Sequence, residues 1–218
     1  MRIDIPWTEK NLIIAGHYGS GKTELALNLA FAHAGEGITL VDLDIVNPFF
    51  RANELRADLT KAGVRVLAPT FANTTVDVPS LPPDILSIFV DERRAILDVG
   101  GDHAGARVLG QYRRHIGKAG YAFWMVANAR RPLTRSAGEI TAMAREIEAT
   151  SGLTVTGLIN ATNLGDETTA GIIAEGLAVT GEAARDLDVP LIASAGFNRF
   201  AGEFSPYIPI ERYLRPSF

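Results

Sequence analysis

Short hydrophobic runs alternate with longer amphipathic segments along most of this chain. The first two runs, residues 11–15 and 38–43, are mostly hydrophobic and lead directly into a glycine and an aspartate. Such runs are typical of strands in a parallel sheet that helices cover on both faces. The pattern predicts strands at residues 11–15, 38–43, 64–68, 95–99, 121–127, 153–159 and 191–195.

The longer segments between these runs have the 3.6-residue period of amphipathic helices. They predict helices at residues 24–34, 51–61, 107–118, 133–149 and 166–187, with one or two helical turns at 84–90. In the last helix, Gly171, Gly176 and Gly181 do not follow the helical period, which indicates close packing or a break. Residues 69–83 have the composition of a loop, and residues 196–218 are expected to form an irregular tail. We therefore predict an α/β fold: one domain, residues 1–218, with a mostly parallel sheet of about seven strands between helices.

The composition is that of a soluble globular protein with a sizeable core. Of the 218 residues, 47% are hydrophobic and 21% are charged, and the formal net charge is −4. The negative charge argues against nucleic acid as a partner. The chain has no cysteine and no run of the ~20 hydrophobic residues that span a membrane. From the residues at its two ends we expect no signal peptide and no amphipathic membrane helix. We expect a cytoplasmic protein that does not bind membranes.

One motif indicates the chemistry. It follows the first predicted strand, precedes the first predicted helix and fits G-x-x-x-x-G-K-[ST], with the residues Gly16, His17, Tyr18, Gly19, Ser20, Gly21, Lys22 and Thr23. In such a P-loop, successive backbone N–H groups and the helix N-terminus hold the phosphates of a nucleotide. We expect Lys22 to reach the β- and γ-phosphates and the Thr23 hydroxyl to bind Mg²⁺.

Acidic residues close two of the other predicted strands. Asp42 and Asp44 end the second run, and Asp98 stands in the fourth, just before Gly100 and Gly101. Ligands of open parallel sheets bind beyond the carboxyl ends of the strands. We predict that Asp98 holds the water shell of Mg²⁺ and that Asp42 or Asp44 orients or deprotonates the attacking nucleophile. The Gly101 N–H is positioned to meet the γ-phosphate.

Together with Gly157-Leu158-Ile159-Asn160, these residues resemble the P-loop NTPases of the MinD/ParA/nitrogenase-iron-protein type, the SIMIBI class. The resemblance covers residues 11–200. It implies Mg-ATP binding, a water-activating aspartate at Asp42 or Asp44, Mg²⁺ held through water by Asp98, and often a nucleotide-controlled homodimer. It also implies that Asn160, with Asn163 close behind, contacts the adenine, and that the segment at 195–198, which includes Phe197, lies against the base.

The sequence departs from the family in two places. His17 stands where many members have a signature lysine, which puts activation across a dimer by that lysine in doubt. The absence of cysteine excludes an iron–sulfur cluster held by this chain. Guanine-specific relatives carry an Asn/Thr-Lys-x-Asp element, whereas this chain has Asn160-Ala161-Thr162-Asn163, which favours ATP over GTP.

Three functions fit these residues. The first is a Mg-ATP-dependent switch ATPase that changes its binding to an unidentified protein partner. The second is a small-molecule kinase or ATP-dependent ligase on a related scaffold, of the dethiobiotin synthetase kind. The third is a module that binds the nucleotide with negligible turnover. The sequence favours the switch without separating it from the other two.

Overall fold

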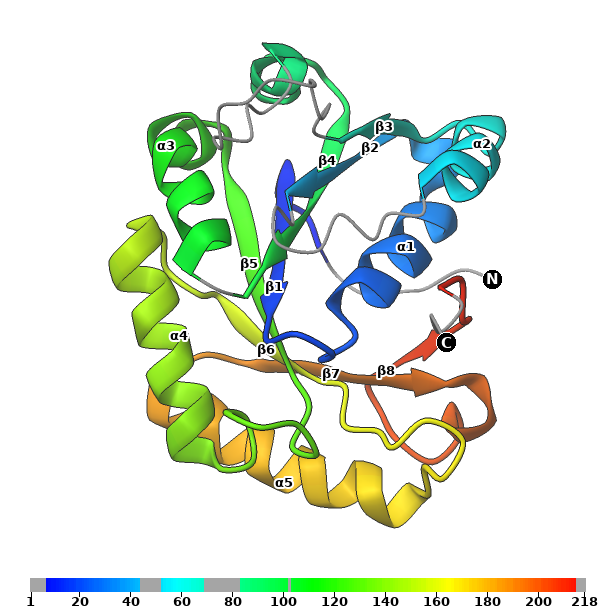
Figure 1. Ribbon diagram of the computed structural model, residues 1–218, viewed down its shortest axis with the longest axis vertical. Helices are drawn as coiled ribbons and strands as arrows, with labels where there is room; N and C mark the ends of the chain where they lie inside the picture. Colours follow the sequence, from blue (N-terminus) through cyan, green and yellow to red (C-terminus); the bar gives the residue numbers. More distant parts are fainter. Residues whose placement is uncertain (1–6, 44–51, 69–82, 102, 215–218) are drawn as a thin grey trace, which may run out of the picture.

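A single parallel sheet organises the residues that the computed structural model describes, which are 7–43, 52–68, 83–101 and 103–214. Its strand order is β3-β2-β4-β1-β5-β6-β7-β8, so β1 lies near the centre between β4 and β5 (Figure 1). The strands are β1 (Asn11–Gly16), β2 (Ile38–Leu43), β3 (Arg65–Leu67), β4 (Arg94–Gly100), β5 (Tyr121–Ala127), β6 (Gly157–Asn160), β7 (Leu191–Phe197) and β8 (Tyr207–Ile210).

Helices cover both faces of the sheet. The described helices are α1 (Lys22–Ala32), α2 (Ala52–Lys61), α3 (His103–Ala119), α4 (Ala137–Ser151) and α5 (Ala170–Leu187), with 3₁₀ turns at Ala34–Glu36, Pro83–Phe89 and Asn198–Phe200. One hydrophobic core joins the sheet to α1 and α2, and a second joins it to α3, α4 and α5. In Figure 1 these two groups lie on opposite sides of the sheet. The expected three-layer α/β architecture is therefore confirmed.

The largest difference from the expected fold is at the end of the chain. We expected residues 196–218 to be irregular, but β7 continues to Phe197 and β8 adds an eighth strand at residues 207–210. Proline at position 209 disfavours a helix, and it also disfavours a central strand because it lacks the N–H group that such a strand donates. β8 is at the edge of the sheet, where a missing N–H leaves no ladder hydrogen bond unmade.

Two helices begin later than the pattern predicts. α4 starts at Ala137, where Ser136 and Glu139 form a reciprocal capping box. α5 starts after Thr169, whose hydroxyl accepts a hydrogen bond from Ile172 N. The strand expected at 153–159 is confined to Gly157–Asn160.

The glycines of α5 do not break it, and one of them permits a close approach. A Cβ atom at Gly176 would lie 2.7 Å from Asn160 Oδ1 and still closer to the Thr162 side chain. Glycine at this position therefore lets the helix backbone pack directly on the loop after β6. That loop forms part of the site described below.

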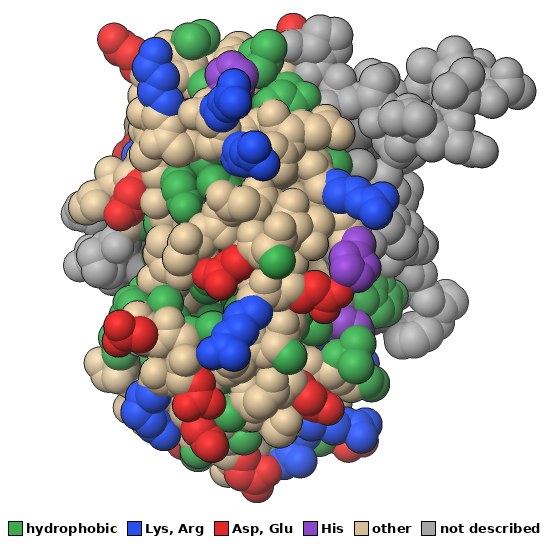
Figure 2. All heavy atoms as spheres, turned by 90° about the vertical axis from the view of Figure 1, so that its left-hand side faces the viewer, with side chains coloured by type: hydrophobic (Ala, Val, Ile, Leu, Met, Phe, Trp, Pro, Cys, Tyr) green, Lys and Arg blue, Asp and Glu red, His purple; other side chains and the backbone are tan. Residues whose placement is uncertain are grey.

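The face that carries α3 and α4 has charges of both signs. Figure 2 shows Lys and Arg interspersed with Asp and Glu on this side of the molecule. One contact between the two helices is the pair of His103 Nε2 and Glu146 Oε1, at 2.6 Å. No large area of one charge is visible on this face.

Within the described residues, no helix combines the length and hydrophobicity needed to cross a bilayer.

Candidate nucleotide-binding site

The P-loop connects the central strand β1 to α1, as the sequence pattern predicts. Gly21 is the N-cap of α1 and has φ 91°, a left-handed conformation that glycine adopts without a steric penalty. Because Gly21 has no side chain, no side-chain hydrogen bond caps α1. The N–H groups at the start of α1 are thus not capped by a Ser, Thr or Asp side chain, and such N–H groups can bind an anion. Lys22, at 7% exposure, starts the helix.

Of the three aspartates expected at the site, the structure describes Asp42 and Asp98, which lie next to each other across β2 and β4. Asp42 and Asp98 are direct register partners, and both are buried, at 4% and 1% exposure. Register partners in a parallel pair lie on the same face of the sheet, and Leu40 and Ile96, two residues earlier, belong to the core beneath α1. Both carboxylates therefore lie on the face that α1 covers, where Lys22 and Thr23 begin the helix.

The end of β4 packs tightly against the start of the P-loop. β1 and β4 pair as far as Gly16 and Gly100. At the next residue, Gly101, a Cβ atom would lie 2.8 Å from His17 N and closer still to the carbonyl group of Gly16. Only glycine fits this approach without moving the backbone. The contact places Gly101 beside the phosphate loop, and the hydrogen bond from its N–H to a γ-phosphate stays a prediction.

The donor set on this side of the sheet suits magnesium. Mg²⁺ takes oxygen ligands, keeps several waters and binds few protein carboxylates directly. The Thr23 hydroxyl at the start of α1 and the carboxylates of Asp98 and Asp42 at the strand ends are such groups. Asp44, the other expected catalytic acid, lies outside the described residues.

A cavity of about 230 Å³ adjoins the P-loop on the β6–β8 side of the sheet. Its walls come from α1, the loop after β6, α5, the end of β7 and the residues after β8; they are Gly19, Gly21, Glu24, Leu25, Ala161, Thr162, Asn163, Thr168, Ile173, Ala195, Gly196, Phe197, Ile210 and Arg212. The volume is below the ~300–1,000 Å³ of typical ligand pockets. A cavity this small beside a phosphate loop suits the base of a nucleotide, with the phosphates lying along the loop.

Of the three residues expected to contact the base, two line the cavity and one is buried away from it. Asn163 and Phe197 line the cavity. Asn160 is fully buried: its amide donates to Ile173 O at 3.1 Å and to Ser194 Oγ at 3.0 Å, and its Oδ1 accepts from Thr162 N. These bonds fix the loop after β6 and give Asn160 a structural role, and its expected contact with adenine stays a prediction.

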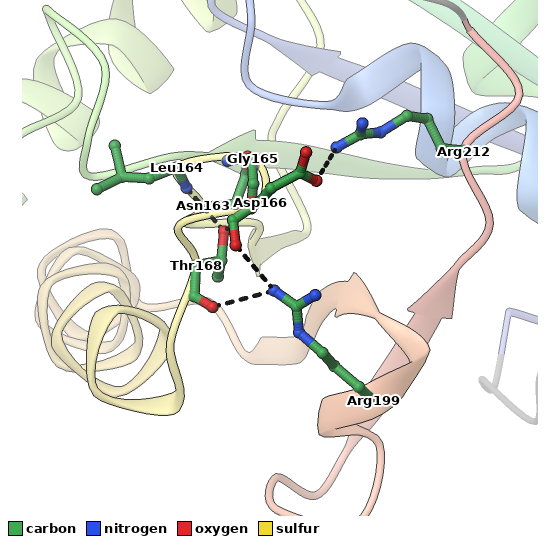
Figure 3. Close-up of polar contacts among 7 residues, drawn as sticks. All are labelled: Asn163, Leu164, Gly165, Asp166, Thr168, Arg199 and Arg212. Atoms are coloured by element: carbon green, nitrogen blue, oxygen red, sulfur yellow. Dashed lines mark hydrogen bonds and ion pairs between the residues drawn. The ribbon is translucent and has the colours of Figure 1, made fainter.

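Two arginines from the end of the chain hold the loop after β6. Arg199 donates to the carbonyl oxygens of Asp166 and Thr168, at 3.4 and 3.1 Å, and Arg212 pairs with the Asp166 carboxylate at 3.4 Å (Figure 3). Both guanidinium groups also lie over the Phe197 ring, at 4.9 and 5.2 Å from its centroid. This wall of the cavity thus depends on residues distant from the P-loop in sequence.

The segment after β8 is fastened to the P-loop helix. Glu24, directly after Thr23, accepts hydrogen bonds from Tyr213 N at 3.0 Å and Leu214 N at 2.8 Å. One turn later, Asn28 exchanges two hydrogen bonds of 2.9 Å with the backbone of Glu211. Burial raises the pKa of Glu24, and the two backbone N–H groups and Arg212 oppose that rise. Sequence reasoning missed this contact, because an acid in the first turn of a helix is ordinary.

Comparison with known proteins bears on the fold. No family model and no curated protein matches the sequence. Among solved structures, the chain is similar to the cell division protein FtsY of Thermotoga maritima, at 20% identity and a TM-score of 0.51, over 87% of this chain and 63% of that one. It is also similar to FtsY of Mycoplasma mycoides, at 16% identity and a TM-score of 0.50, over 87% and 62%. The chain thus spans less than two thirds of the length of these proteins.

The topology, the phosphate loop and these similarities define the fold. The chain has the fold of the P-loop NTPases of the SIMIBI class, to which the FtsY proteins belong. The expectation drawn from the motifs is confirmed at the level of the fold.

Proposed function

We propose that this protein binds Mg-ATP and acts as a nucleotide-dependent switch that changes its binding to a protein partner. The observation that carries the proposal is the P-loop, in which a left-handed Gly21 opens the N-terminus of α1 without a side-chain cap. The buried pair of Asp42 and Asp98 stands on the same face of the sheet. Lys22 and the loop N–H groups would hold the phosphates, and Thr23 and Asp98 would hold Mg²⁺. Asp42 is the described candidate for orienting the attacking water.

The preference for adenine rests on the lining of the cavity. Guanine offers two adjacent donors that a free carboxylate accepts, and Asn163 stands where guanine-specific proteins have that acid. The Asn163 amide is itself engaged, since Nδ2 donates to Ala161 O and Oδ1 accepts from Gly165 N. The one carboxylate among the described lining residues belongs to Glu24, whose two oxygens already accept from Tyr213 and Leu214. These contacts support ATP.

A homodimer across the carboxyl edge of the sheet is part of the proposal. Three large hydrophobic side chains are exposed in loops that follow strands at this edge. They are Tyr18 in the P-loop at 68%, Leu133 after β5 at 58% and Leu164 after β6 at 44%. Exposed hydrophobic groups beside a nucleotide site suit a surface that a partner covers. Light scattering with and without Mg²⁺ and a non-hydrolysable ATP analogue tests this, and an unchanged monomer would contradict it.

The central experiment is calorimetric titration with ATP, ADP and GTP in the presence of Mg²⁺. We expect ATP to bind more tightly than GTP, and Lys22→Ala to abolish binding while leaving the circular dichroism spectrum unchanged. Folded Lys22→Ala protein with wild-type ATP affinity would show that the loop assignment is wrong. Phosphate release without any added metabolite supports the switch. Phosphate release only with an acidic or hydroxyl substrate would favour the kinase or ligase. Nucleotide binding without phosphate release would favour a binding module with negligible turnover.

A further inference from the structure

An arginine outside the P-loop motif lies directly on the phosphate loop. A Cβ atom built at Gly19 would be 3.2 Å from Arg131 Nε and 3.3 Å from its Cζ. Arg131 belongs to the loop between β5 and α4, more than one hundred residues later in the sequence. Its guanidinium group therefore covers the backbone of Gly19, two residues before the N-cap of α1.

The loop that carries Arg131 is held in one conformation by Asn128. This fully buried residue accepts from Arg131 N through its carbonyl oxygen and from Arg130 N through Oδ1, both at 2.9 Å. Its carbonyl oxygen also accepts from the Thr134 hydroxyl at 2.8 Å. Leu133, in the same turn, has φ 64°, which is a strained conformation for a residue with a branched side chain. Such strain is found where the surrounding structure fixes a loop for function.

The two consecutive arginines differ in their charge partners. Arg130 pairs with the carboxylate of Glu175 on α5. Among the described residues, no carboxylate pairs with Arg131, and its side chain is exposed at the rim of the loop. The chain thus holds a cation against a phosphate-binding loop without a described anion to balance it.

We infer that Arg131 is a further phosphate-binding residue, which contacts the terminal phosphate of a bound nucleoside triphosphate. This inference rests on the proposed function. The loop N–H groups bind the α- and β-phosphates and Lys22 reaches the β- and γ-phosphates. A second cation beside the loop adds a donor for the third phosphate, which carries the most negative charge of the three. A planar guanidinium group suits this role, because it donates two parallel hydrogen bonds to phosphate oxygens.

The test compares triphosphate and diphosphate affinities in matched variants. Kd values for Mg-ATP and Mg-ADP are measured by calorimetry for the wild type, Arg131→Gln, Arg131→Lys and the control Arg130→Gln. Losing the charge-assisted hydrogen bonds to the phosphate should raise the ATP Kd of Arg131→Gln about tenfold or more, with the ADP Kd nearly unchanged. Arg131→Lys should be intermediate, and Arg130→Gln should match the wild type.

Each outcome decides between the two proposals. Equal losses for ATP and ADP in Arg131→Gln would mean that Arg131 only packs on the loop, and the inference would be wrong. Unchanged ATP affinity in that variant would also overturn it, with the proposed function intact. A wild type that binds neither nucleotide would overturn the proposed function and this inference together. Inorganic tripolyphosphate and pyrophosphate, titrated in parallel, repeat the comparison without a base.

Discussion

Replacing Gly101 by alanine tests how far the phosphate loop depends on its contact with the end of β4. The new Cβ atom would lie 2.8 Å from His17 N and closer to the Gly16 carbonyl group, whereas real Cβ contacts are essentially never under 3.0 Å. Each close atom belongs to the backbone of the P-loop and cannot rotate away. The loop and the end of β4 must therefore move apart.

The cost of this movement can be worked out in two parts. Overpacking a close contact lowers the free energy of unfolding by about 1–3 kcal/mol. A displacement of about 1 Å at groups that position a substrate can lower the rate on the order of 10²-fold. A 10²-fold loss corresponds to about 2.7 kcal/mol, and because the displaced atoms form the phosphate cradle, we expect nucleotide binding and stability to fall by similar free energies.

The control is Gly117→Ala in α3. A Cβ atom at Gly117 would have no atom within 4 Å, and alanine in a helix is favoured over glycine by about 1 kcal/mol. Urea denaturation should therefore show Gly117→Ala to be slightly more stable than the wild type and Gly101→Ala to be less stable. Calorimetry should show wild-type binding of Mg-ATP by the control alone. Folded Gly101→Ala protein with wild-type affinity would refute the reasoning.

Three further predictions concern the metal, the end of the chain and its pH dependence. Asp98→Asn should shift the magnesium titration of ATP binding to higher concentration while changing ATP-independent stability much less; an unaltered titration contradicts its role. Asn28→Ala removes both hydrogen bonds to Glu211, so it should lower the free energy of unfolding by about 1–3 kcal/mol and weaken nucleotide binding, as denaturation and calorimetry would show. Because burial raises the pKa of Glu24 above 4.5, the folded state holds its proton more tightly than the unfolded state, and stability is lost as the pH rises through that raised pKa. The stability of the wild type relative to Glu24→Gln should thus fall as the pH rises above 4.5, and a constant difference in urea denaturation across this range would contradict the assignment.

Seven of the strands, the phosphate loop and the acidic strand ends could be predicted from the sequence. Each of these features depends on residues that are close together in the sequence. A hydrophobic run defines each buried strand, and the G-x-x-x-x-G-K-[ST] spacing defines the turn into α1. The rule that ligands bind beyond the carboxyl ends of parallel strands then pointed to Asp42 and Asp98. The structure pairs these two residues directly across β2 and β4.

Contacts between segments that are distant in the sequence determine which side chains line the cavity and which ones hold its walls together. Asn160 looked like a base contact, yet its amide is used to fasten β6 to α5 and β7. Glu24 looked like an ordinary first-turn acid, yet it binds a segment almost two hundred residues later. The Arg131 side chain lies beside Gly19, although the two residues are far apart in the sequence. The physical reason is that a polar side chain can satisfy its hydrogen bonds with any partner that folding brings near. Spacing along the chain fixes the backbone, but proximity across the fold selects the partners.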